Sequence, residues 1–249
     1  MMTPAAIRVG TAGWSIPRTS AQSFDIGGTH LQRYSRRLTC VEINSSFHRP
    51  HAFTTYAKWR DSTPSEFRFA VKLPRTITHE RRLEDTRDLL VAFLDQTQGL
   101  GEKRGPLLVQ LPPSLAFDES LAAPFFQLFR ELHHGAVVCE PRHATWFTAS
   151  ADARLQTFAV GRVAADPATV AAAAVPGVWS GIAYFRLHGS PRTYWSRYDE
   201  QFIATLTTAI SHLGALAEIW CVFDNTASGA AAANAVELSD QLARGTSSP

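Results

Sequence analysis

The chain has few of the residues that crosslink a small fold, and it lacks the segments that mark a membrane or secreted protein. Its 249 residues include three cysteines, Cys40, Cys139 and Cys221, with no Cys-x-x-Cys spacing. Each lies inside a β-like run, so we interpret them as small buried residues rather than metal or redox groups. No apolar run approaches the ~20 residues of a membrane span. The N-terminus shows no secretory signal, so we expect a cytoplasmic protein with no membrane partner.

An excess of charge of either sign is also missing. The formal net charge is +2 at pH 7, which does not favour nucleic acid or an anionic membrane as a partner. No internal repeat, charge block or extended linker divides the chain. A hydrophobic fraction of 45% and a charged fraction of 18% are typical of a globular protein. Length alone leaves two small domains or one large α/β barrel open, and the sequence leaves the oligomeric state open.

What the chain does have is a regular alternation of short β-type runs and helix-type stretches. The β-type runs are residues 7–11, 39–43, 67–73, 106–111, 136–139, 162–166, 182–187 and 218–223. Helical patterns follow most of them, at 29–37, 52–60, 85–100, 119–132, 151–160, 199–213 and 230–242, while only a brief alanine-rich segment follows the sixth run. This order predicts parallel strands joined by right-handed crossovers.

Eight such units predict one α/β domain over residues 1–249, a single (β/α)8 TIM-type barrel. The barrel is expected at about 7–243, with a flexible tail at 244–249. A doubly wound open sheet is the alternative fold. Its glycine-rich first turn, G-x-G-x-x-G, is absent from this chain.

Polar residues gather where the β-type runs end, which is where barrels of this type build their active sites. The residues at these ends are Glu42, Asn44, Lys72, Gln110, Glu140, Arg142, Asp166, Arg186, His188, Asp224 and Asn225, with His79 and His143 nearby. At three ends the polar residues stand two apart and so share one face of the strand. Deeper positions, such as Cys40, Val138 and Tyr184, are apolar or small. This pattern favours an active site, although a solvated network of ion pairs stays open as the alternative.

Carboxylates, imidazoles and cations in one place are suited to acid–base chemistry on an anionic substrate. We expect Glu42 and Glu140 to act as the acid–base groups, with His188 or His143 as the acid or proton shuttle. The cations are expected to hold the anion, and these are Lys72, Arg142 and Arg186. The partner would be a small phosphorylated or carboxylated metabolite. The residues do not separate a hydrolase from a lyase or an isomerase.

The last two strand-to-helix loops suggest a second way to hold an anion. Gly189 follows the seventh run, and Ser228 and Gly229 stand directly before the last helical stretch. Barrels often bind phosphate between these loops, with backbone N–H groups and a helix N-terminus as donors. A simple helix cap by Ser228 is an equally good interpretation.

Two further classes of function stay open. The mouth carboxylates with His188 could form an Mg or Mn site, as in sugar isomerase and phosphodiesterase barrels. No H-x-H or H-E-x-x-H pair supports such a site, so we predict no metal and no cofactor. Residues 190–198 interleave two arginines with three aromatic residues, including Tyr194 and Tyr198. This loop could act as a lid over the site. It could also be a stacking surface in a non-enzymatic module that binds nucleic acid or a metabolite. The chain has no basic face elsewhere, so nucleic acid is the lesser alternative.

A set of motifs, in this order along the chain, resembles the YecE-like family, a bacterial and archaeal domain of unknown function. The motifs are VGTAGW at 9–14, VEINSSF at 41–47, FAVK at 69–72, LVQLPP at 108–113, EPRH at 140–143, RLHG at 186–189 and FDN at 223–225. The resemblance implies a TIM-type barrel and little biochemistry.

With the family motifs included, fifteen residues are expected to bind the substrate. They are Trp14, Asn44, Lys72, His79, Gln110, Arg142, Trp146, Asp166, Arg186, Gly189, Tyr194, Tyr198, Asp224, Asn225 and Gly229. The family pattern also falls on Asn234. Two departures concern the site: Asp224 replaces the usual asparagine, and residues 15–20 replace an aromatic and Trp-x-Gly element.

Overall fold

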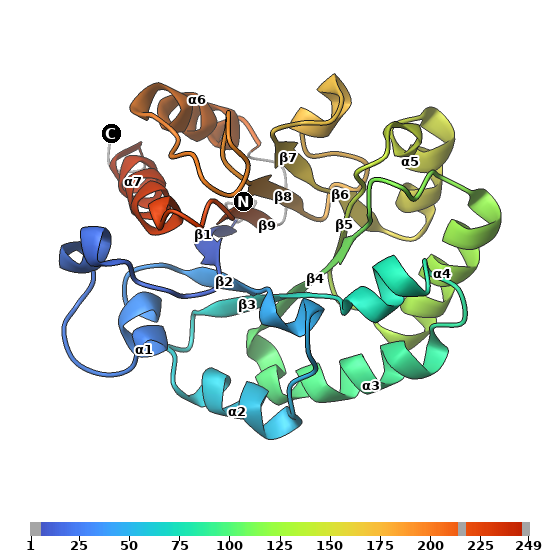
Figure 1. Ribbon diagram of the computed structural model, residues 1–249, viewed down its shortest axis with the longest axis horizontal. Coiled ribbons are helices and arrows are strands. Elements are labelled where there is room, and N and C mark those ends of the chain that lie inside the picture. The colour runs from blue at the N-terminus through green and yellow to red at the C-terminus, as the bar shows by residue number, and fades with distance from the viewer. Residues whose placement is uncertain (1–5, 214–217, 246–249) are drawn as a thin grey trace, which may run out of the picture.

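The computed structural model describes residues 6–213 and 218–245, and all nine of its strands belong to one parallel sheet surrounded by helices (Figure 1). The strands are β1 (Ala6–Ala12), β2 (Cys40–Ile43), β3 (Arg68–Lys72), β4 (Arg104–Gln110), β5 (Val137–Glu140), β6 (Val160–Arg162), β7 (Ala164–Asp166), β8 (Ala183–Leu187) and β9 (Glu218–Phe223). The α-helices are α1 (His30–Ser35), α2 (Phe53–Asp61), α3 (Arg87–Thr97), α4 (Glu119–Leu132), α5 (Ala149–Thr157), α6 (Glu200–Ser211) and α7 (Ala230–Gly245).

The sheet curls into a nearly closed barrel. Its strand order is β6-β5-β4-β3-β2-β1-β9-β8-β7, and the two outer strands, β6 and β7, follow one another in the chain with only Val163 between them. The backbone N–H of Val163 donates to the carbonyl of Cys139 in β5 at 2.9 Å. The backbone N–H of His188, just after β8, donates to the carbonyl of Asp166 in β7 at 2.7 Å. The predicted (β/α)8 TIM-type architecture is therefore confirmed.

The sequence predicted the sixth strand as one run at 162–166. The structure has two short strands there, β6 and β7. The break falls at Val163, directly after Arg162. The backbone N–H of Arg162 donates to the carbonyl of Gly177 at 2.9 Å, and its carbonyl accepts from the Gly177 N–H at 3.2 Å. These bonds form an isolated antiparallel bridge with a residue outside the barrel. After β7 the chain forms a short 3-10 helix, Ala171–Ala174, where the other units have an α-helix.

The core has two parts, as expected for a barrel in which successive residues face opposite sides of the sheet. One part fills the barrel interior and comprises Cys40, Ala70, Leu108, Val138, Val163, Ile182, Tyr184, Trp220 and Val222. The larger part lies between the strands and the helices. All three cysteines are free and buried, which confirms their interpretation as buried residues.

Helices α1, α4, α5 and α6 each begin after a residue whose side chain caps the helix. The Asp199 side chain accepts from the backbone N–H of Phe202 and so caps α6, which buries Ile203, Leu206 and Ile210 against the sheet. Helix α7 extends through Gly245, so the first two residues of the expected flexible tail are helical. The rest of that tail, 246–249, lies outside the described residues. Within the described part, no helix is long and apolar enough to cross a membrane.

Candidate active site at the barrel mouth

A buried arginine, Arg186 from β8, lies at the centre of the barrel mouth. Its Nε is 2.9 Å from Glu42 Oε2 and its Nη2 is 2.7 Å from Glu42 Oε1, a two-bonded contact with one carboxylate. Its Nη1 donates to Glu140 Oε2 at 2.8 Å, and its Nη2 also donates to Asp224 Oδ2 at 3.0 Å. Burial acts against the charge, but these three carboxylates raise the pKa of Arg186 well above its ordinary value.

The expectation that Arg186 holds the substrate anion stays a prediction, and in the structure its donors bond to carboxylates of the protein. The arginine is fully buried, and its donors point at carboxylates from β2, β5 and the end of β9. The sequence correctly predicted that these strand ends converge. In the structure, Arg186 organises the carboxylates rather than facing the opening.

The two glutamates predicted to be acid–base groups are held by the same network. Glu42 is fully buried, and its Oε2 also accepts from the Tyr184 hydroxyl at 2.8 Å. Glu140 accepts from Gln110 Nε2 at 3.0 Å, and its Oε1 lies 2.8 Å from Arg142 Nε. Burial would raise the pKa of Glu140, but Arg186, His188 and Arg142 hold it well below the ordinary value. Glu140 therefore stays ionised near neutral pH and has no proton to donate.

His188 is enclosed between two carboxylates. Its Nδ1 is 3.1 Å from Asp224 Oδ2, and its Nε2 is 2.9 Å from Glu140 Oε1 and 3.1 Å from Arg142 Nη2. The ring is fully buried beneath Tyr194, whose ring meets it edge-on at 5.4 Å between centroids. Every polar atom of the imidazole is occupied, so His188 is built to position Arg142, Glu140 and Asp224.

Lys72, at the end of β3, is in a different environment. Lys72 is 7% exposed, and its ammonium lies 4.0 Å from the centroid of the Phe47 ring. The Lys72 carbonyl accepts from the Ser46 hydroxyl at 2.7 Å, but the ammonium has no hydrogen-bond or ion-pair partner among the described residues. Burial, followed by the nearby charge of Arg186, lowers the pKa of Lys72 to about 8. A cation over an aromatic face is stabilised, but far less than by a carboxylate partner.

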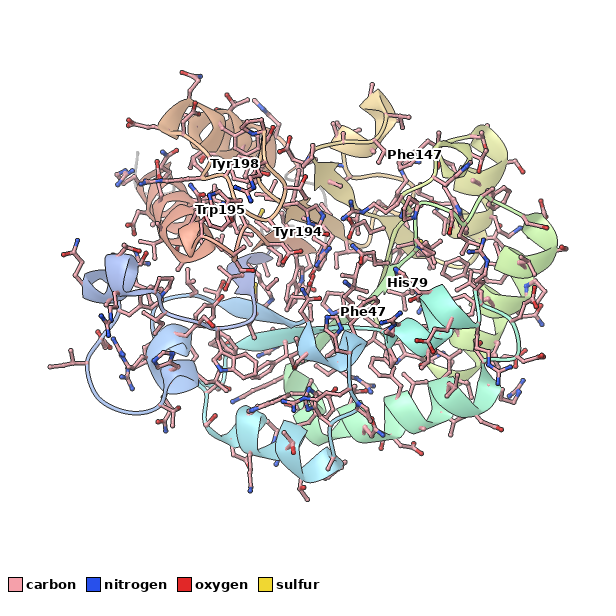
Figure 2. All side chains as sticks on the ribbon, in the orientation of Figure 1. Phe47, His79, Phe147, Tyr194, Trp195 and Tyr198 are labelled. Carbon is pink, nitrogen blue, oxygen red and sulfur yellow. The ribbon has the colours of Figure 1, made fainter. Side chains whose placement is uncertain are left out.

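His79 and Arg142 complete the side of the mouth that faces the opening. His79 lies in a short π-helical turn, Thr76–Glu80, with its ring against Phe47 at 4.9 Å and its Nδ1 2.8 Å from the Thr78 hydroxyl. Burial, together with Lys72 and other cations, lowers the pKa of His79. The Arg142 side chain is 21% exposed. Figure 2 shows Phe47 and His79 near one another, with Tyr194 across from them.

The loops after β8 and β9, where an anion site was predicted at Gly189 and Gly229, bond to each other. The anion site itself stays a prediction. The Gly189 N–H donates to the Tyr198 hydroxyl at 2.8 Å, and that hydroxyl donates to Asp166 Oδ1 at 2.7 Å. The Ser228 hydroxyl donates to the carbonyl of Trp195, so it does not cap α7 either. An added Cβ at Gly229 would lie 2.9 Å from the Pro17 ring, so the loop after β9 also packs closely against the first loop.

Asn225 belongs to the same set of loop contacts. Its Nδ2 donates to the carbonyl of Ser196 at 2.9 Å and to Asn234 Oδ1 at 3.0 Å. Asn234 Nδ2 in turn donates to the carbonyl of Tyr198 at 2.8 Å. Asp166, Tyr198 and Asn225, all expected to bind the substrate, therefore hold the loops together.

Three other predicted site residues lie outside the network. Trp14 packs edge-on against Trp59 at 5.0 Å. Trp146 is 1% exposed and donates from Nε1 to the carbonyl of Leu115, so it is a core residue. His143 bonds through Nδ1 to the Thr145 hydroxyl and caps the short 3-10 helix Ala144–Trp146. In the described part of the chain, none of the three side chains has a hydrogen bond, ion pair or ring contact with the side chain of Lys72 or Arg142.

The remaining predicted residues lie on the rim. Asn44 follows β2 and has a buried Oδ1 without a described partner. Tyr194 and Trp195 are 45% and 46% exposed, and the Arg192 guanidinium lies 4.6 Å over the Trp195 ring. This exposed group is compatible with the lid or stacking surface expected from residues 190–198, which stays a prediction.

Two residues of the site were not singled out from the sequence. Tyr184 stands two residues before Arg186, so period-two alternation already placed it on the same inner face. Phe47 lies in a loop motif after β2, and nothing in its spacing indicated contact with a lysine from the next strand. The π-helical turn that carries His79 has no sequence signature of its own.

No group of three or more His, Cys, Asp or Glu residues within 6–213 and 218–245 is arranged to hold a metal ion. The mouth carboxylates instead direct their oxygens to Arg186, Arg142 and His188. The predictions about metals and cofactors stay predictions.

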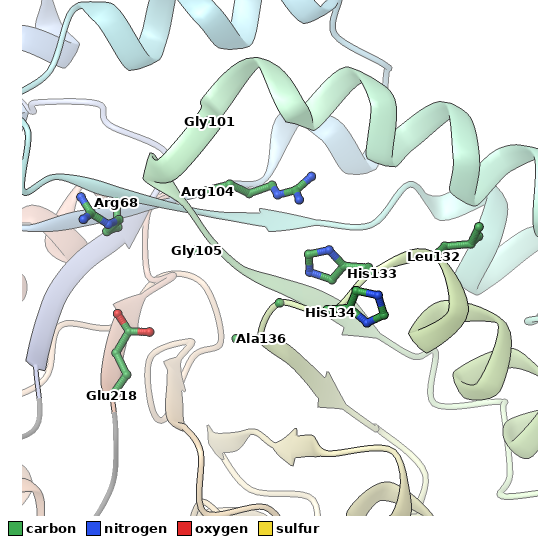
Figure 3. Close-up of a pocket in the computed structure, with 10 residues that line it drawn as sticks. Arg68, Gly101, Arg104, Gly105, Leu132, His133, His134, Ala136 and Glu218 are labelled. Atoms are coloured by element: carbon green, nitrogen blue, oxygen red, sulfur yellow. The ribbon is translucent and has the colours of Figure 1, made fainter.

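The opposite end of the barrel contains a cavity of about 590 Å³. Its lining comes from the starts of β3, β4 and β9 and from the segment before β5, including Arg68, His133 and Glu218 (Figure 3). Burial and the cations Arg104 and Arg130 lower the pKa of His133 to about 4. None of the predicted site residues lines this cavity, and active sites of such barrels lie at the other end.

The comparison with known proteins agrees with the barrel and its motifs. A family model described as a protein of unknown function, DUF72, matches residues 8–249. The chain belongs to the DUF72 family. The UPF0759 protein YecE of Escherichia coli strain K12 is 31% identical over 138 residues, which are 55% of this chain and 49% of YecE. The match thus spans about half the length of this curated relative, and the predicted resemblance to the YecE-like family is confirmed.

Two solved DUF72 structures share the fold. A DUF72 protein from Enterococcus faecalis V583 superposes with a TM-score of 0.81 at 21% identity, covering 95% of each chain. A DUF72 protein from Thermotoga maritima MSB8 gives a TM-score of 0.78 at 22% identity, covering 96% of this chain and 99% of the other. At these identities the likeness concerns the fold alone.

Proposed function

We propose that this DUF72 protein is an enzyme that binds a small phosphorylated or carboxylated metabolite at the barrel mouth and transforms it by acid–base chemistry. The observation that carries the proposal is the division of charge at the mouth. The carboxylates of Glu42, Glu140 and Asp224 bond to the buried Arg186, while Arg142 is partly exposed and the Lys72 ammonium has no hydrogen-bond or ion-pair partner among the described residues. An anion is the ligand that such an opening favours.

The roles differ from those expected from sequence. Arg142 is the group best placed to hold an anionic substituent, because it is partly exposed and its position is fixed by Glu140 and His188. Lys72 is the proton-exchanging group, since a pKa of about 8 lets it both give and take a proton near neutral pH. Glu140 and His188 position Arg142, while Glu42 is bonded to Arg186 and Tyr184.

Thermal unfolding of the whole chain with a panel of sugar phosphates and organic acids tests the proposal. A ligand at a hundred times its dissociation constant adds about 2.7 kcal/mol to the free energy of unfolding. We expect stabilisation by one anionic class, lost in Arg142→Ala and retained in Arg87→Ala. Arg87 is a suitable control because it lies on α3 with a side chain 60% exposed. Stabilisation by no anion, or equal stabilisation of Arg142→Ala, would overturn the proposal.

A further inference from the structure

Lysine is scarce in this protein. The sequence contains 21 arginines and only three lysines, Lys58, Lys72 and Lys103. Lys58 is exposed on α2. Lys103 donates to the carbonyls of Arg60 at 2.7 Å and Thr63 at 2.6 Å. Lys72 alone combines burial with an ammonium group that has no hydrogen-bond or ion-pair partner among the described residues.

The residue type at position 72 is informative, because arginine and lysine differ in one chemical respect. A guanidinium keeps its proton in proteins, whereas an ammonium can lose it and become a nucleophilic amine. A mouth that needed only a fixed positive charge there would be served by arginine, which the chain uses at almost every other cationic position.

The surroundings of Lys72 are those that activate an amine. Lys72 is only 7% exposed, so its ammonium is desolvated, and the charge of Arg186 opposes its protonation. The Phe47 ring face, 4.0 Å away, favours the charged form only weakly. Desolvation and a neighbouring cation are the two means by which proteins generate a nucleophilic lysine. The mouth carboxylates, which would favour the ammonium form, are bonded to Arg186.

We propose that Lys72 is a nucleophile that forms an imine with the carbonyl group of a small anionic aldehyde or ketone. This inference rests on the proposed function and names its substrate class. Arg142 would hold the phosphate or carboxylate of the same molecule, so the two cations at the opening divide the work between the carbonyl and the anionic end.

The step balances without an oxidant or reductant. The neutral Nζ attacks the carbonyl carbon, the C=O electron pair moves to oxygen, and proton transfer from nitrogen to oxygen gives a carbinolamine. The hydroxyl group then takes a proton carried by His79 and leaves as water while the nitrogen lone pair forms C=N. The resulting protonated imine returns its N–H proton to His79. Amine and carbonyl thus give imine and water. His79, which packs against the same Phe47 ring, is the proton carrier we assign to these transfers.

Reductive trapping tests the inference on the full chain. The protein is incubated with sodium cyanoborohydride and either pyruvate or glyceraldehyde 3-phosphate, and the modified lysines are found by peptide mass mapping. We expect one reduced adduct at Lys72, formed at least about tenfold faster than at Lys58, because a lowered pKa leaves far more free amine. The rate should rise as the pH passes about 8, where Lys72 loses its proton.

Two variants make the result decisive. Lys72→Arg keeps the charge and should lose the adduct, whereas Lys58→Arg should keep it. Adducts distributed equally over the three lysines, or no adduct at Lys72, would overturn the imine proposal. In that case, stabilisation of the wild type by an anion would still support the proposed function. Absence of both the adduct and the stabilisation would overturn both.

Discussion

Arg186 shows how one buried side chain can set the character of a site. It brings together carboxylates from β2, β5 and the end of β9, which would otherwise repel one another at the centre of the barrel. Burying charge is costly unless each charge is paired, and removing one partner leaves the others unpaired. Three carboxylates depend on this one guanidinium, so its loss should be among the most damaging changes in the chain.

Arg186→Met should lower the free energy of unfolding by about 3–5 kcal/mol, the usual effect of breaking a buried pair. Chemical denaturation followed by circular dichroism measures this difference. Arg87→Ala, which breaks the surface pair with Glu131, should cost less than about 1 kcal/mol. If Arg186→Met were as stable as Arg87→Ala, the network would not have the structural role that its geometry indicates.

At the same scale, the sequence predicted the members of the site better than their roles. Period-two spacing placed Glu42, Glu140 and Arg186 on inner faces at the same end of the barrel. It could not say which cation the carboxylates would bind, because that depends on the lateral position of each strand around the barrel. Arg186 was therefore assigned to the substrate, and Lys72, left without a carboxylate, was assigned the same role as the arginines.

At the scale of elements, the loops after β8 and β9 show why loop function is harder to predict than strand position. The glycines at 189 and 229 fit a phosphate-binding pattern, yet Gly189 has φ +93° and its N–H bonds to Tyr198. The bond depends on a side chain nine residues away whose hydroxyl also reaches Asp166. Such tertiary contacts leave no local signal in the sequence.

Two glycines with left-handed backbone provide a matched test of this packing. At Gly189 an added Cβ would lie 2.8 Å from the Ser196 carbonyl oxygen, whereas at Gly13, with φ +81°, nothing lies within 4 Å. Both alanine variants carry the backbone cost of about 1–2 kcal/mol. Thermal or chemical unfolding should show a further loss of at least about 1 kcal/mol for Gly189→Ala, from overpacking. Equal losses in the two variants would contradict the close loop packing.

At the scale of the whole molecule, the barrel was predictable because each βα unit repeats the same pattern. Seven of the eight predicted β-type runs each coincide with one strand of the barrel. Each of these runs is a short apolar stretch followed by a helical pattern. The sixth differs because Arg162 bonds through its backbone to Gly177, an interaction that spans fifteen residues and divides the strand. The direction of each charge at the mouth emerges only when all strands are assembled.

In the assembled mouth the carboxylates are bonded to Arg186, and the Lys72 ammonium has no hydrogen-bond or ion-pair partner among the described residues. Burial disfavours the charged form of a lysine, so its pKa falls below the ordinary value. The ammonium should therefore lose its proton within the range in which many enzymes work, while Arg142 keeps its charge. Both the acid–base role and the imine depend on this one property.

The most direct test is an NMR titration of the protein labelled with ¹³C at the lysine side chains. Three lysines give a spectrum simple enough to assign with Lys72→Arg. One resonance, absent from that variant, should titrate with a midpoint of about 8. A Lys72 midpoint at the ordinary lysine value of about 10.4 would show an unperturbed amine and contradict its role at the barrel mouth.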